Sequence, residues 1–141
     1  MKKKAFIFDL DGTLFETTAQ EIESATGHMR YIEFNDSAML LEESKPLSLL
    51  WLARTVQKEN HDVYILTARN SIVYPAIKKL LADHGIKAKY VFTVGDRGFD
   101  IPAYKAEILT TLSKDYGSTY FFDDDEANLE MAPSHIRTIK A

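Results

Sequence analysis

Phe6-Ile7-Phe8-Asp9-Leu10-Asp11-Gly12-Thr13-Leu14 lies near the start of this 141-residue chain and decides its fold. The stretch opens as an apolar run typical of a buried strand, and two carboxylates two residues apart follow it. Alternate side chains of a strand point the same way, so strand spacing continued past the run predicts that Asp9 and Asp11 project together. In open α/β sheets ligands bind at this carboxyl end. Two acids there can hold a divalent cation and divide nucleophilic from acid–base work, and Gly12 allows a sharp turn beside a ligand.

The composition is that of an ordinary globular domain, with 45% hydrophobic and 27% charged residues. The length predicts a single domain over residues 1–141. A net charge of −4 gives no reason to expect tight nonspecific binding to nucleic acid. The absence of cysteine excludes disulfides and thiol catalysis. No apolar run approaches membrane-spanning length, so we expect a cytoplasmic protein without membrane association.

Strand-like apolar runs alternate with segments of helical periodicity, which predicts an α/β fold with a mostly parallel, five-stranded sheet. The expected strands cover residues 4–10, 63–66, 89–94, 119–122 and 136–139. Helices are expected from Pro46, after a Ser71 cap, from Asp100 and Pro102, and over residues 124–131. The connections are short enough for βαβ units.

Residues 25–44 are the hardest part of the chain to interpret. The capping-box pattern of Thr18–Glu21 predicts a short helix, and residues 31–34 have the composition of an edge strand. Asn35-Asp36-Ser37 is typical of a turn or a helix cap.

Four consecutive acids, residues 123–126, follow the fourth expected strand. So much negative charge at one strand end is costly unless a cation balances it. Oxygen ligands without cysteine favour a hard divalent cation such as Mg²⁺. The alternative is an acidic helix cap, which needs one acid rather than four. The cluster therefore predicts a magnesium site.

Ile65-Leu66-Thr67-Ala68-Arg69 closes the second expected strand with a hydroxyl, just before a helix. The Thr67 hydroxyl can bond a phosphate oxygen, and the backbone amides from Ala68 onward add the anion affinity of a helix N-terminus. Arg69 offers a bidentate contact to phosphate or substrate, and a surface ion pair is the alternative.

The pattern Asp-x-Asp-Gly-Thr-Leu behind a hydrophobic strand closely resembles the first motif of the haloacid dehalogenase-like (HAD) phosphohydrolases. Thr67 resembles the second motif, Lys105 near the start of a helix resembles the third, and Asp124 with Asn128 resembles the fourth. Asn128 stands where the family commonly has a second acid. The resemblance covers nearly the whole chain and implies a three-layer, Rossmann-like fold.

The resemblance also implies which residues carry out a two-step phosphoryl transfer. Asp9 is the expected nucleophile and Asp11 the general acid and base. Magnesium is expected on Asp9, on the backbone carbonyl of Asp11 and on Asp124, with Asp123 nearby. The expected phosphate contacts are the amides near Gly12, together with Thr67, Ala68 and Lys105.

The segments in which this family inserts caps are short here, so no large cap domain is expected. An open site admits large substrates, and the preferred substrate is a nucleotide or a polynucleotide end carrying a phosphomonoester. Within the loop 95–100, Arg97 and Phe99 could contact such a substrate, although an ordinary turn is the simpler interpretation. Sugar phosphates, phosphoproteins and a non-catalytic phosphate-binding module stay open as alternatives. Asp11 argues against a dehalogenase, and the missing cap argues against a phosphomutase.

Overall fold

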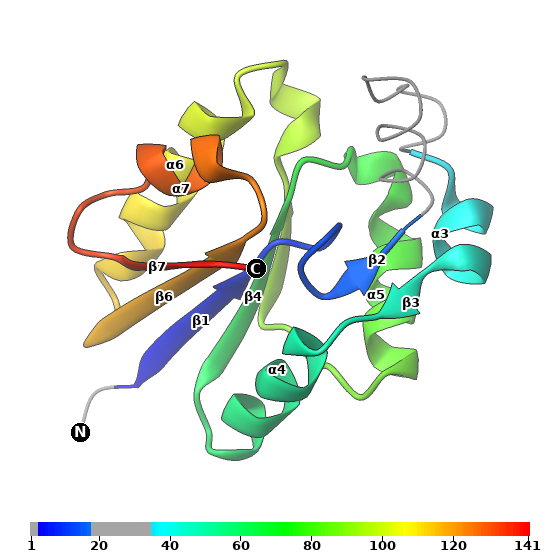
Figure 1. Ribbon diagram of the computed structural model, residues 1–141, viewed down its shortest axis with the longest axis horizontal. Helices are drawn as coiled ribbons and strands as arrows, with labels where there is room; N and C mark the ends of the chain where they lie inside the picture. The colour runs from blue at the N-terminus through cyan, green and yellow to red at the C-terminus, as the bar shows by residue number, and fades with distance from the viewer. Residues whose placement is uncertain (1–2, 18–34) are drawn as a thin grey trace.

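The computed structural model describes residues 3–17 and 35–141 of the chain. A five-stranded sheet runs through its centre in the order β5-β4-β1-β6-β7, with every pair of neighbouring strands parallel (Figure 1). The strands are β1 (Lys4–Phe8), β4 (Asp62–Thr67), β5 (Tyr90–Thr93), β6 (Ser118–Asp123) and β7 (Arg137–Lys140). The predicted five-stranded α/β fold is therefore confirmed, with a sheet that is wholly parallel.

Helices cover both faces of this sheet and make a three-layer structure (Figure 1). On one face lie α3 (Ser37–Glu43), α4 (Leu49–Lys58), the 3₁₀ turn η1 (Ser71–Val73) and α5 (Tyr74–Asp83). On the other lie η2 (Val94–Arg97), α6 (Ile101–Ser113) and α7 (Glu126–Met131). No helix in these described ranges has the length and apolar character needed to cross a bilayer.

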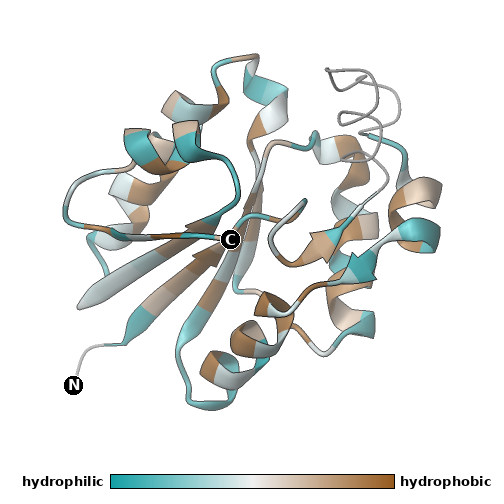
Figure 2. Ribbon diagram, in the orientation of Figure 1, coloured by the Kyte–Doolittle hydropathy of each residue, from teal (hydrophilic) through white to brown (hydrophobic). Residues whose placement is uncertain are grey.

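Alternation along the strands sends apolar side chains into both helical layers. From β1, Phe8 joins the core under α4 and α5, whereas Ile7 joins the core under α6. The Phe8 ring stacks on Phe122 with centroids 4.6 Å apart, which ties β1 to β6. Burial on both faces explains why the strands read as nearly continuous apolar runs (Figure 2).

The strand order reverses at β1. The chain proceeds from β1 outward to β4 and β5, then crosses back to β6 and β7 on the other side of β1. Ligands of open α/β folds bind at such a switch point, outside the carboxyl ends of the strands. Residue 9 follows β1 directly and therefore lies at this position.

Two predicted helix starts differ from the structure. Pro46 does not begin a helix but belongs to β3 (Lys45–Pro46), which pairs antiparallel with β2 (Phe15–Glu16), so α4 begins at Leu49. Asn70 rather than Ser71 caps the turn before α5, since its side chain accepts from the Ile72 amide.

The predictions for residues 18–44 have mixed outcomes. Asp36 caps α3 by accepting from the Met39 amide, which confirms the helix-cap interpretation. The expected helix at 18–21 and edge strand at 31–34 lie outside the described residues. Within the described ranges, β2 and β3 are the elements that add to the three layers, and no large cap domain is present.

Candidate functional site

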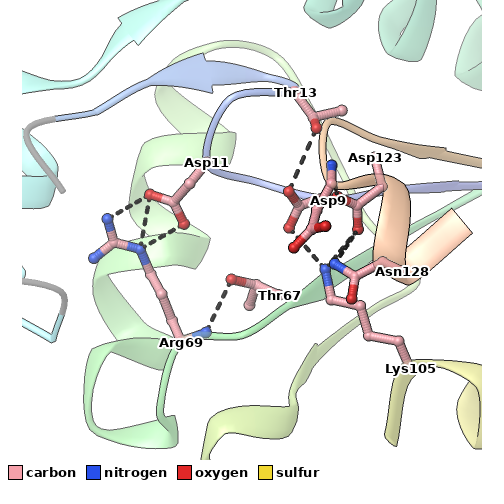
Figure 3. A network of polar contacts seen from close by, with 9 residues as sticks. Asp9, Asp11, Thr13, Thr67, Arg69, Lys105, Asp123 and Asn128 are labelled. Atoms are coloured by element: carbon pink, nitrogen blue, oxygen red, sulfur yellow. Dashed lines mark hydrogen bonds and ion pairs between the residues drawn. The ribbon is translucent and has the colours of Figure 1, made fainter. Parts of the chain in front are cut away.

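A tight turn after β1 separates the two carboxylates of the opening motif. The Leu10 carbonyl accepts from the amides of Thr13, Leu14 and Phe15 at 3.1–3.3 Å, so the chain folds back at once. Gly12 has φ +79°, a conformation in which a side chain is strained. The strand spacing therefore does not continue to Asp11, and the prediction that both carboxylates project together is wrong. Asp9 and Asp11 face different partners (Figure 3).

Asp9 belongs to a cluster of three carboxylates built by two neighbouring strands. Oxygen atoms of Asp9, Asp123 and Asp124 all lie within 4.8 Å of one another. The Asp9 amide donates to the Phe122 carbonyl at 2.9 Å, which holds the end of β1 beside the end of β6. The cluster thus forms where the two parallel strands end.

Lys105 reaches this cluster from α6, which lies in the same helical layer as α7. It is the fifth residue of α6 and is only 1% exposed. Its Nζ lies 3.0 Å from Asp9 Oδ1 and 2.8 Å from Asp123 Oδ2 (Figure 3). A lysine this deeply buried requires such partners, because an unpaired charge in the interior is very costly.

The cluster contains more acidic than basic groups, and this excess together with burial shifts their pKa values. Burial, reinforced by Asp123, Asp11 and Asp124, raises the pKa of the Asp9 carboxyl well above its ordinary value although Lys105 opposes the shift. Burial also raises the pKa of Asp124. Burial by itself would lower the pKa of the Lys105 ammonium, but Asp9 and Asp123 outweigh it and raise that pKa. The Lys105 ammonium therefore stays charged, whereas burial and repulsion among the acids disfavour ionisation of the Asp9 and Asp124 carboxyl groups.

The four consecutive acids have different partners. Asp125 caps α7 by accepting from the Ala127 amide at 2.9 Å. Glu126 is exposed and pairs with Lys140 at 2.9 Å. Only Asp123 and Asp124 point into the cluster with Asp9. The acidic run therefore contains two carboxylates directed into the cluster, Asp123 and Asp124, and one helix cap, Asp125.

Asn128 supports Asp123 rather than Asp124. Its Nδ2 donates to Asp123 Oδ2 at 3.0 Å from the first turn of α7. Its Oδ1 is buried and has no hydrogen-bond partner among the described residues. A buried acceptor without a donor is costly, so this atom fits a water or a cation's hydration shell beside the carboxylates.

The cluster fits a hard divalent cation. All of its candidate ligands are carboxylate oxygens, the donors that Mg²⁺ prefers. Three carboxylates against the one ammonium of Lys105 give a net charge of −2 when all are ionised. A divalent cation neutralises that charge. The Asp11 side chain is outside this cluster, and a metal contact through its backbone carbonyl stays a prediction.

Thr67 is the last residue of β4, the strand on the other side of β1 from β6, and Arg69 lies two residues beyond it. Thr67 Oγ1 is fully buried and accepts from the Arg69 amide at 3.1 Å, which leaves its own proton for another acceptor. The Arg69 guanidinium is also buried and binds Asp11, with Nη2 2.6 Å from Asp11 Oδ1. The sequence prediction of a phosphate contact for Arg69 did not anticipate this pair.

Gly95 in η2 is packed directly against the loop that carries Thr67 and Arg69. Its amide donates to the Arg69 carbonyl at 3.2 Å. A Cβ at this position would overlap the Ala68 carbonyl oxygen and lie 2.9 Å from the Arg69 carbonyl oxygen. Glycine is therefore required here for close approach of two backbones.

The other residues of the 95–100 loop do not reach the carboxylates. Arg97 pairs with Glu107 at 3.1 Å, and its carbonyl accepts from the Tyr104 hydroxyl. Phe99 is wholly exposed. The turn interpretation of this loop fits these contacts.

Two threonines of the site were missed by the sequence argument. Thr13 Oγ1 lies 3.4 Å from Asp9 Oδ2, and Thr17 Oγ1 lies 2.6 Å from Asp11 Oδ1. Thr13 belongs to the opening motif and could have been included with it. Thr17 has no local signal, because its contact depends on the turn that brings the chain back beside Asp11.

No protein-family model matches the chain, and no curated protein matches it in sequence. Solved structures do match. A chain of the Pnkp1/Rnl/Hen1 RNA repair complex superposes with a TM-score of 0.72 at 17% identity, over 99% of this chain and 42% of that one. The present chain therefore spans less than half the length of that relative.

Two further matches come from single proteins. A HAD family enzyme from Bacteroides thetaiotaomicron, in complex with magnesium and inorganic phosphate, has a TM-score of 0.59 at 18% identity, covering 98% of this chain and 93% of that one. A HAD-superfamily hydrolase from Geobacter sulfurreducens has a TM-score of 0.65 at 16% identity, covering 98% and 89%. At these identities the likeness shows the fold, which is HAD-like.

Proposed function

We propose that the protein is a magnesium-dependent phosphomonoester hydrolase that works through an aspartyl-phosphate intermediate. One observation carries the proposal. Asp9 lies at the switch point of the sheet with an oxygen 3.0 Å from a buried lysine and within 4.8 Å of two further carboxylates. A carboxylate held between a fixed cation and a cluster of net negative charge is suited to attack a phosphoryl group once a divalent cation is bound.

In the first step an Asp9 carboxylate oxygen attacks phosphorus. The bond from phosphorus to the ester oxygen breaks, and the carboxylic acid of Asp11 gives its proton to that leaving oxygen. The products are the free alcohol and a phosphoryl group bound to Asp9.

In the second step a water molecule attacks the phosphoryl group of the intermediate. Asp11, now a carboxylate, accepts a proton from that water, and the bond between phosphorus and the Asp9 oxygen breaks. Orthophosphate leaves, and both aspartates return to their starting states.

The remaining residues bind and orient the transferring group. Thr67 Oγ1 has a proton to donate to a phosphoryl oxygen, since its lone pair already accepts from the Arg69 amide. Lys105 holds Asp9 in place and offsets negative charge next to it. The amides near Gly12 and Ala68 are the further proposed contacts to phosphate.

Asp9, Asp124 and the Asp11 carbonyl are the proposed ligands of Mg²⁺, and Asp123 takes part through the carboxylate cluster. Bound magnesium supplies charge neutralisation between the carboxylates and the incoming phosphate. Asn128 orients Asp123 within this arrangement.

The proposed substrate is a phosphorylated nucleotide or polynucleotide end. The superposition on a chain of an RNA repair complex supports this choice over sugar phosphates and phosphoproteins, which are the alternatives. A phosphate-binding module without turnover is the alternative outside enzymology, and the complete set of Asp9, Asp11 and Lys105 argues against it.

The test is phosphate release by the wild type, by Asp9→Asn and by Asp83→Asn, with magnesium or with a chelator. The substrates are p-nitrophenyl phosphate, mononucleotides, sugar phosphates, a phosphopeptide, and oligonucleotides phosphorylated at the 3′ or 5′ end. Asp83 is a matched control because it is exposed and pairs only with Lys79 on the surface of α5.

We expect magnesium-dependent release that falls by about 10⁴-fold or more in Asp9→Asn and is unchanged in Asp83→Asn. The best substrate of the panel then identifies the class. Release that survives in Asp9→Asn contradicts the assigned nucleophile. Saturable phosphate binding by the wild type, with no release from any substrate, supports the binding module instead.

A further inference from the structure

The Asp11 carboxylate accepts hydrogen bonds from two side chains, those of Arg69 and Thr17. Arg69 Nη2 and Thr17 Oγ1 each lie 2.6 Å from Asp11 Oδ1, and Arg69 Nε lies 3.2 Å from the same oxygen. The other oxygen, Oδ2, receives one contact, from Arg69 Nε at 3.0 Å. The two oxygens of one carboxylate are therefore in very different surroundings.

All three side chains of this group are removed from solvent. Asp11 is 8% exposed, and Arg69 and Thr17 are 2% exposed. Burial makes the arrangement rigid, because a bidentate guanidinium pair has strong geometric preferences and little water competes for it. Figure 3 shows the pair on the far side of Thr67 from the Asp9 cluster.

The backbone also fixes the Arg69 side chain from its own end. The Arg69 amide donates to Thr67 Oγ1, and its carbonyl accepts from the Gly95 amide. The guanidinium thus extends from a restrained loop at the end of β4 to the turn after β1. Its hydrogen bonds to Asp11 use Nε and Nη2, one of the two edges of the guanidinium that can bind an oxyanion in a bidentate manner.

We propose that Arg69, together with Thr17, is a positioning residue that anchors Asp11 by Oδ1 and leaves Oδ2 to exchange the proton with the leaving oxygen and with water. This inference rests on the proposed phosphatase function. It assigns Arg69 to Asp11 rather than to the phosphate, and it assigns the proton to one named atom.

The test uses the chemistry of the leaving group. A p-nitrophenolate leaves without receiving a proton, whereas the alkoxide of a nucleoside 3′-monophosphate needs one. A residue that acts through Asp11 is therefore required for cleavage of the nucleoside 3′-monophosphate and nearly dispensable for cleavage of p-nitrophenyl phosphate. A residue that binds phosphate, or that only stabilises the fold, affects both esters alike.

The experiment measures kcat/KM for both esters with the wild type, Arg69→Gln, Arg69→Lys and Thr17→Val at saturating magnesium. The ratio kcat/KM reports the steps up to the first irreversible one, so it isolates cleavage of the ester from hydrolysis of the intermediate. Arg137→Gln serves as control, because Arg137 is exposed on β7.

We expect Arg69→Gln to lower kcat/KM by about 10²–10³-fold for the nucleotide, within the usual contribution of general acid catalysis, and by less than about tenfold for p-nitrophenyl phosphate. Thr17→Val should show the same preference with a smaller loss, and Arg69→Lys should recover only part of it. In an Asp11→Asn background, Arg69→Gln should cause no further loss.

Equal losses for the two esters, or additive losses in the Asp11→Asn background, would overturn the inference while the phosphatase function stands. Absence of phosphate release by the wild type from every substrate of the panel described above would overturn the function and the inference with it. If Arg69→Gln does not fold, the Thr17→Val ratio and the double variant Arg69→Gln/Asp11→Asn, which removes both charges of the buried pair, decide the outcome in the same way.

Discussion

The carboxylates at the two ends of the central sheet differ in how their negative charge is balanced. At the amino end, Asp62 at the start of β4 is surrounded by donors: its Oδ2 accepts from the Tyr116 hydroxyl at 2.6 Å and from Lys89 at 3.2 Å, and Lys3 lies 3.7 Å from Oδ1. At the carboxyl end, Asp9 and Asp123 share the ammonium of Lys105, and Asp124 lies in the same carboxylate cluster. Among the described residues, several donors surround one acid at the amino end, whereas two acids share one ammonium in this cluster.

The pKa directions follow this difference. Burial would raise the pKa of Asp62, but the Tyr116 hydrogen bond and Lys89 outweigh it and lower that pKa. Burial raises the pKa of Asp9, and Lys105 alone cannot reverse the shift. A charge that only supports the fold is balanced by the protein itself. The excess charge at the carboxyl end instead suits a site whose balance is completed by a ligand.

Lys105→Met is expected to have the largest effect on stability. It removes the only cation from the carboxylate cluster and leaves Asp9 and Asp123 buried without a counter-charge. We expect a loss of about 3–5 kcal/mol in the free energy of unfolding at pH 7 in chelator, measured by urea denaturation. The loss should shrink at lower pH, because protonation of the acids relieves it.

Lys140→Met is the matched control for that variant, because Lys140 is exposed and pairs with Glu126. It should change stability by less than about 0.5 kcal/mol. Similar losses in the two lysine variants would contradict the claim that the carboxylate cluster depends on the buried ammonium of Lys105.

Asn128→Asp is expected to increase the excess of negative charge in the carboxylate cluster. The variant replaces a donor to Asp123 with a fourth carboxylate in a buried position. We expect the metal-free protein to lose about 1–3 kcal/mol, and magnesium to recover more stability than it gives the wild type. Thermal unfolding with and without magnesium measures both quantities. A variant as stable as the wild type in chelator would show that the cluster tolerates another charge.

Asp124→Asn is expected to act in the opposite direction. A carboxyl whose folded pKa is raised binds more protons in the folded state, so its ionisation costs stability as the pH rises above the ordinary value. Removal of this group should raise the metal-free Tm by roughly 2–4 °C at pH 7 and abolish most of the rise caused by magnesium.

Asp125→Asn provides the control for Asp124→Asn. Asparagine caps a helix as well as aspartate does, so the cap on α7 is kept while a neighbouring charge is lost. Its response to magnesium should equal that of the wild type. If magnesium failed to raise the Tm of either variant, its effect would depend on the net charge of the region rather than on the carboxylate cluster.

Asp62→Asn should have the smallest effect, because its ion pairs lie at the surface. We expect a loss below about 1 kcal/mol at pH 7. Because the folded pKa of Asp62 is lowered, the stability it contributes is present above the ordinary value of about 3.9 and is lost as the pH falls through the folded pKa. Urea denaturation at pH 7 and pH 3 should show the difference between wild type and variant shrinking. A difference that grows toward pH 3 would reverse the assigned direction.

The sheet was predictable because burial on both faces makes the inner strands β1, β4 and β6 read as largely apolar runs. The first strand and the acids that follow it needed only local pattern. Pro46 was misplaced because its partner is Phe15, far away in sequence, and a two-residue pairing leaves no periodicity. The strand pairing also explains why Asp9 and Asp124 come together although 115 positions separate them.

Side-chain partners were less predictable than backbone positions. The sequence placed Arg69 at a strand end, where a phosphate contact and an ion pair are both plausible, and the turn after Asp11 brings the carboxylate partner of the ion pair within reach. Asn128 similarly has two carboxylates within reach of its helix, and the geometry selects Asp123. Thr17 depends on the same turn and could not have been found from spacing.

Gly95 has a consequence for how this protein can vary. It touches neither phosphate nor metal in the proposed reaction, yet any side chain there would push apart the backbones of η2 and the Thr67–Arg69 loop. In a saturation library selected for turnover, position 95 should therefore tolerate as few replacements as a position that performs chemistry. Phe99, four residues away and wholly exposed, should accept almost any residue as far as folding is concerned. Intolerance to mutation would then mark a point of contact between two loops, and a catalytic group would have to be recognised by other means.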